Sequence, residues 1–91
     1  MMPGGQAEPL SLSDVHAGRS ARVLGLRGGR SVSDRLASLG LVPGAHVHVL
    51  QNPTQGPLLV GVQGTRLALG RGEAAKVSVV LEGEPARDVD A

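Results

Sequence analysis

The stretch RLASLGLVPG, residues 35–44, contains the most specific structural signals of this chain. Leu36 and Leu39 lie three positions apart, which places them on one face of a helix. Gly40 follows them, and glycine commonly ends a helix because it adopts the left-handed conformation without Cβ strain. The Pro43-Gly44 pair is typical of a tight turn. The sequence therefore predicts a short helix that stops at Gly40 and a sharp change of chain direction directly after it.

The residues before this stretch predict the start of the helix and a preceding strand. The run SVSD, residues 31–34, offers a serine hydroxyl and an acid that can cap the free N–H groups of a helix start. Residues 19–26 read as a strand with Ala21 and Val23 facing inward. The alternation breaks around Gly25, which predicts a β-bulge or bend there.

The residues after the stretch predict further strands and few helical residues. Gln63-Gly64 has the composition of a two-residue hairpin turn between two of these strands. With the strand at 19–26, the pattern predicts about five strands and one short α-helix, and hence a mostly β fold that closes into a small barrel. The predicted strands after the turn are residues 46–51, 58–62, 65–69 and 76–81.

A chain of 91 residues is the size of one small domain. We expect this domain to cover residues 10–81. Residues 1–9 and 82–91 combine proline, glycine and charge without apolar periodicity, so we expect a flexible N-terminal tail and a flexible acidic C-terminal tail.

Composition excludes several classes of function. The chain has no cysteine, which removes disulfides, thiolate metal sites and cysteine nucleophiles. No stretch approaches the roughly 20 apolar residues of a membrane span, so we expect a cytoplasmic protein without membrane insertion. Residues 10–81 carry eight basic and three acidic side chains, a net charge of +5, although the whole chain is only +1. A mildly basic body suits an acidic partner surface.

Several motifs together resemble the FeoA family over residues 10–81. The most specific is residues 35–44, and it is joined by GRSARV at 18–23, LAL at 67–69, EA at 73–74 and VSV at 77–79. The resemblance implies an SH3-like barrel that acts as a non-enzymatic accessory protein of bacterial ferrous iron transport. Its implied partner is a FeoB-like, GTP-dependent membrane permease, through which the protein would sit peripherally at the inner membrane. Self-association into a homo-oligomer is a further expectation.

The helix exit supplies the candidate partner-binding residues Arg35, Leu41, Val42 and Pro43. We expect Leu39 in the core, and Val42 and Pro43 exposed in the turn beside Arg35. Exposed apolar residues next to an arginine are typical of contact patches. The alternative is that the whole run serves only to stop the helix and turn the chain.

Two histidines are weak candidates for a transition-metal site. His46 and His48 lie two apart and so share a strand face. No third ligand lies near them in the sequence, so we expect solvated polar surface and no cofactor. Four serines lie where turn and cap hydrogen bonding explains them better than catalysis does, so we expect that the protein is not an enzyme. They are Ser11, Ser13, Ser31 and Ser33.

Nucleic-acid binding is the alternative function, either directly or as a regulatory module of an iron-dependent transcriptional regulator. The +5 charge of the body could hold phosphates. However, no aromatic residue is present to stack on a base, and the basic residues are scattered along the chain. We therefore expect no nucleic-acid partner.

Overall fold

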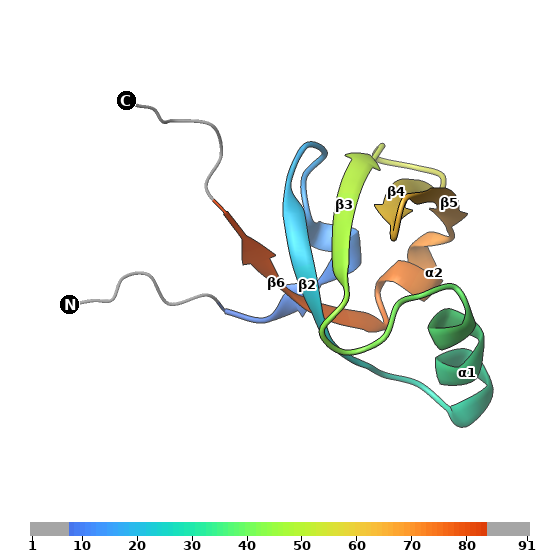
Figure 1. The fold of residues 1–91 in the computed structure, drawn as a ribbon. Helices are drawn as coiled ribbons and strands as arrows, with labels where there is room; N and C mark the ends of the chain where they lie inside the picture. Colours follow the sequence, from blue (N-terminus) through green and yellow to red (C-terminus); the bar gives the residue numbers. More distant parts are fainter. Residues whose placement is uncertain (1–7, 84–91) are drawn as a thin grey trace.

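The computed structural model describes residues 8–83, which form a strongly curled antiparallel sheet with a short helix outside it (Figure 1). The strands run in the spatial order β1-β6-β2-β3-β4-β5. The elements are β1 (Leu10–Ser11), the 3₁₀ turn η1 (Leu12–Asp14), β2 (Ser20–Leu26), α1 (Arg30–Ser38), β3 (His46–Gln51), β4 (Leu58–Val62), β5 (Thr65–Leu69), α2 (Arg71–Ala74) and β6 (Val77–Glu82).

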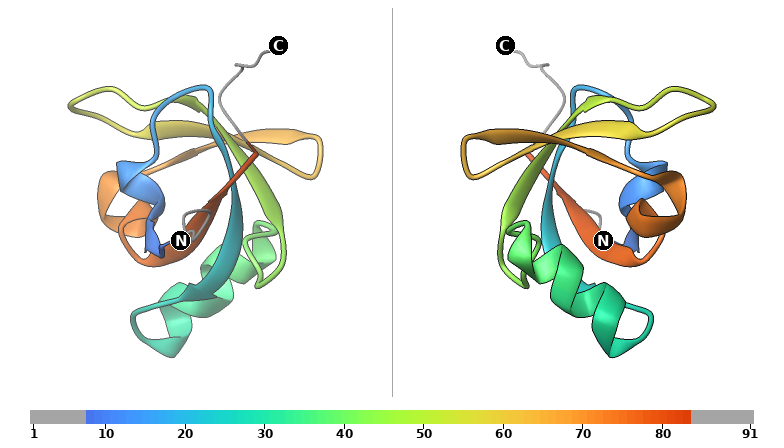
Figure 2. Two further views of the ribbon diagram at one scale, coloured as in Figure 1. Left: turned by 90° about the vertical axis from the view of Figure 1, so that its left-hand side faces the viewer. Right: turned by 90° about the vertical axis from the view of Figure 1, so that its right-hand side faces the viewer.

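The two side views show the strands curling around a common interior (Figure 2), which is filled by one cluster of aliphatic side chains. Alternate residues of β2, β3, β4 and β6 point inward and are buried. Ala21 and Val23 of β2 are among them, as the sequence predicted. With no aromatic residue in the chain, leucine, valine and alanine fill the interior. The buried residues are Leu12, Val15, Ala21, Val23, Leu36, Leu41, Val47, Val49, Leu58, Val60, Val62, Leu69, Ala74, Val77 and Val79.

Two local predictions are confirmed. The register of β2 against β6 shifts between Val23 and Gly25, which is the expected bulge and helps the sheet to bend. The β4–β5 hairpin turns through Gln63 at φ 53° and Gly64 at φ 78°. Two successive positive φ angles define a type I′ turn, whose twist matches that of the two strands.

Other boundaries differ from the sequence prediction. Within residues 8–83 the sheet has six strands, because Leu10 and Ser11 pair with Val79 and Ser78 as an additional short strand. Helix α1 begins at Arg30 with Gly29 as its N-cap, so the prediction of a serine cap at residues 31–34 is wrong. Strand β6 extends to Glu82, and most of the two expected tails lies outside the described residues.

Candidate partner-binding surface

Helix α1 ends in a Schellman motif, which is formed by residues 36–41 of the stretch RLASLGLVPG. The amide of Leu41 donates to the carbonyl of Leu36 at 3.1 Å, and that of Gly40 donates to Ala37 at 2.9 Å. Gly40 has φ 97°, the left-handed conformation that this motif needs and that glycine adopts freely. The predicted helix stop at Gly40 is confirmed.

The motif fixes which apolar side chains reach the surface. It folds Leu41 back onto Leu36, and both side chains are fully buried. We therefore leave Leu41 out of the surface candidates and assign it to the core. The prediction that Leu39 is a core residue is wrong, because it is 38% exposed. Val42, at 37%, and Pro43 are exposed as expected.

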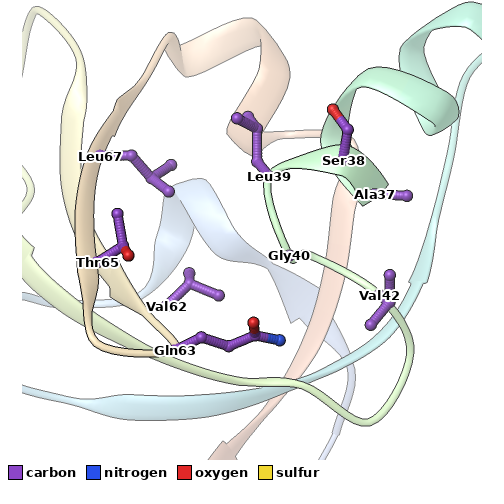
Figure 3. Close-up of a pocket in the computed structure, with 9 residues that line it drawn as sticks. All are labelled: Ala37, Ser38, Leu39, Gly40, Val42, Val62, Gln63, Thr65 and Leu67. Carbon is purple, nitrogen blue, oxygen red and sulfur yellow. The ribbon is translucent and has the colours of Figure 1, made fainter.

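Leu39 and Val42 line a groove between the end of α1 and the β4–β5 hairpin. We call it the α1–β5 groove, and Figure 3 shows its lining side chains. Its volume is about 570 Å³. None of the lining residues is charged: they are Ala37, Ser38, Leu39, Gly40, Val42, Val62, Gln63, Thr65 and Leu67. The sequence predicted the exposure of Val42 in the helical wall but not that of Leu39, and no local pattern indicates the hairpin wall, which begins twenty residues after Val42.

Arg35 lies on the side of α1 that faces α2, whereas Val42 lies in the turn beyond the helix. Its Nη1 is 2.9 Å from Glu73 Oε2 on α2, and its side chain is 69% exposed. Arg35 lines a second, smaller hollow together with Val32, Glu73 and Lys76. The structure therefore separates the four predicted contact residues. Val42 faces the α1–β5 groove, Arg35 faces α2, Leu41 is internal, and Pro43 is exposed in the turn without lining either hollow.

The histidines have partners that the sequence did not reveal. His46 Nδ1 is 2.6 Å from Glu82 Oε1, and Arg22 Nη1 lies 3.7 Å from the other oxygen of the same carboxylate. His48 Nδ1 lies 2.9 Å from Ser20 Oγ. Glu82 belongs to β6, so the prediction that the C-terminal tail begins at residue 82 is wrong at this residue. Among residues 8–83, no three potential metal-ligating side chains come together.

The loop between β3 and β4 is fixed by two polar side chains. Asn52 Nδ2 donates to the carbonyls of Ser13 at 3.0 Å and Val15 at 2.8 Å. Arg71 Nη1 donates to the carbonyl of Pro53 at 2.7 Å, and its Nη2 donates to Ser13 at 3.3 Å. These contacts join η1, the β3–β4 loop and α2. The side chain of Arg71 therefore stabilises the packing of these three segments.

Within the part of the chain that the structure describes, no helix has the length and apolar character needed to cross a membrane.

Comparison with known proteins places this fold. The family model described as the FeoA domain matches residues 10–81. A crystal structure of an iron uptake regulatory protein, FeoA, is 35% identical, with a TM-score of 0.79, over 82% of this chain and 100% of that one. Stenotrophomonas maltophilia FeoA complexed with zinc, described as a prokaryotic SH3 domain protein, is 36% identical over 77% and 88%, with a TM-score of 0.68.

More distant structures share the fold. FeoA from Chlorobium tepidum is 33% identical over 85% of this chain and 74% of that one, with a TM-score of 0.74. A manganese-dependent transcriptional repressor matches with a TM-score of 0.76 at 19% identity, and this chain covers 44% of it. A search of curated proteins finds no match. The barrel is thus SH3-like, and the chain, matched over residues 10–81, belongs to the FeoA family.

Proposed function

We propose that this protein is a non-enzymatic accessory of bacterial ferrous iron transport that binds a FeoB-like, GTP-dependent membrane permease. The match of the FeoA domain to residues 10–81 supports the transport role. The observation that carries partner binding is the α1–β5 groove, where Leu39 and Val42 remain 38% and 37% exposed. On this proposal the protein is cytoplasmic and reaches the inner membrane through its partner.

The groove has the character of a protein contact site. Its lining is uncharged, and its two exposed aliphatic side chains project from a rigid helix end and turn. Binding energy in protein interfaces concentrates in a few such side chains that become fully desolvated. Arg35 and Pro43 would contribute at the periphery of the same contact, because Pro43 is exposed next to Val42 and Arg35 lies on the α2 side of the helix.

The test is biolayer interferometry with the detergent-solubilised FeoB-like permease of the same organism, without nucleotide, with GDP and with a non-hydrolysable GTP analogue. Val42→Asp should weaken binding about tenfold or more, because it places a charge in the apolar contact. Leu24→Asp is the matched control, since Leu24 is 41% exposed on β2 and does not line the groove. It should bind as the wild type does.

Absence of binding in every nucleotide state would overturn the accessory role. Equal binding of the wild type and Val42→Asp would remove the groove from the proposal while retaining the permease as partner.

The second candidate function is that of a regulatory module of an iron-dependent transcriptional regulator. The likeness to a manganese-dependent transcriptional repressor concerns the fold alone. We therefore place this candidate second.

A further inference from the structure

Strand β5 is an edge of the sheet, and its free side adjoins the α1–β5 groove. In the sheet order, β4 is the only strand beside β5 among residues 8–83. Thr65 and Leu67 of β5 line the groove, opposite Leu39 at the end of α1 (Figure 3). A helix end and a strand edge therefore border one uncharged groove, in which Leu39 faces Leu67 (Figure 3).

The hairpin turn determines which backbone groups of β5 are free. In a two-residue type I′ hairpin the flanking residues, here Val62 and Thr65, form a hydrogen-bonded pair, and such pairs alternate along the ladder. Leu67, paired with Val60, therefore bonds to β4. The N–H and C=O groups of Arg66 and Ala68 consequently point to the free side.

The side chains and the free backbone groups of β5 together determine how an added strand would lie. Leu67 is half-buried on the groove face, whereas Arg66 and Ala68 are exposed on the outer face. A strand added beside β5 would place the residue opposite Leu67 into the groove, and the residue opposite Arg66 on the outer face. The groove favours an apolar side chain, and Arg66 favours an acid.

We propose that β5 binds an extended segment of the partner as an additional strand, with an apolar side chain in the α1–β5 groove and an acidic residue opposite Arg66. This inference rests on the proposed function, and it specifies how the permease would be held. Backbone hydrogen bonds supply affinity in such strand addition, while the alternate side chains supply specificity.

Charge favours a partner segment over a second copy of this chain. Strand β5 reads TRLAL and has no acid, so two paired copies would bring two arginines into one ribbon without a counter-charge. The chain's own ends are also poorly placed, because β1 begins and β6 ends on the side away from α1 and β5 (Figure 1).

The decisive variant is Ala68→Pro, measured by interferometry against the same solubilised permease. Proline removes the N–H that points to the free side and leaves the hydrogen bonds between β4 and β5 in place. Ala68→Val keeps that N–H and is the matched control. We expect Ala68→Pro to weaken binding about tenfold or more, and Ala68→Val to bind as the wild type does.

Amide hydrogen exchange of the wild-type complex supplies a second readout that needs no variant. The amides of Arg66 and Ala68 face solvent in the free protein, so they should exchange fast and become protected in the complex. Those of Leu67 and Leu69 should be protected in both states, because they bond to β4.

The outcomes separate the two proposals. Failure of the wild type to bind the permease overturns the accessory role and the strand addition with it. Binding that survives Ala68→Pro, without protection of Arg66 and Ala68, overturns strand addition alone. A dimer of the free protein in sedimentation velocity that Ala68→Pro dissociates would show that a second copy occupies the edge. If the amides of Arg66 and Ala68 are protected in the free protein, and removal of residues 84–91 abolishes this protection, the chain's own C-terminal residues occupy the edge and strand addition by the permease is overturned.

Discussion

Gly40 is the residue on which the exit from α1 depends. Its φ is 97°, and an added Cβ would lie 3.1 Å from Val62 Cγ1. Gly40→Ala should therefore lower the free energy of unfolding by about 1–3 kcal/mol, because it combines a strained backbone with a tight contact. Urea unfolding followed by far-ultraviolet circular dichroism measures this, since the chain has no tryptophan or tyrosine to report by fluorescence.

Gly72→Ala is the control for this prediction. Gly72 lies within α2, and an added Cβ would meet no atom within 4 Å. Gly72→Ala should leave the free energy of unfolding unchanged or raise it by about 0.5–1 kcal/mol. Equal unfolding midpoints for Gly40→Ala and Gly72→Ala would contradict this prediction, because they would show that the left-handed position at the end of α1 tolerates a side chain.

At the scale of elements, Asn52 holds the β3–β4 loop against η1. Its amide donates to two carbonyls, those of Ser13 and Val15. Asn52→Ala should lower the free energy of unfolding by about 1–3 kcal/mol, because the two acceptors lose their donor in a partly buried site. Thr54→Ala, at an exposed position of the same loop, should change it by less than about 0.5 kcal/mol. Indistinguishable unfolding curves for these variants would contradict the anchoring role of Asn52.

Elements were predictable where a few neighbouring residues determine the geometry. The stop at Gly40, the turn at Gln63-Gly64 and the bulge near Gly25 follow from glycine placement and local alternation. The predicted burial of Leu39 is wrong, because helical spacing continues the apolar face to Leu39. The Schellman motif instead folds Leu41 back onto that face, and Leu39 points outward.

At the scale of the whole molecule, strand order determines what the sequence could not reveal. The two sheet edges differ: β1 has two residues, whereas β5 has five and adjoins the α1–β5 groove. Short edge strands are one way in which proteins limit unwanted pairing, so β5 is the edge left open to a partner. The contact of Glu82 with His46 likewise depends on β6 lying beside β2, which no local pattern indicates.

The charge distribution of the folded molecule argues against a nucleic-acid partner. Several of its basic side chains are already engaged: Arg71 with backbone carbonyls, Arg35 with Glu73, and Arg22 with Glu82. The others among residues 8–83 are Arg19, Arg27, Arg30, Arg66 and Lys76, of which Arg27 and Lys76 are neighbours, and no aromatic side chain is present to stack on a base. We expect no saturable binding to mixed single-stranded oligonucleotides at about 150 mM salt by fluorescence anisotropy, because phosphate contacts alone weaken steeply with salt. Tight binding that falls steeply between about 50 and 200 mM salt would instead support the regulatory module and displace permease binding as the main function.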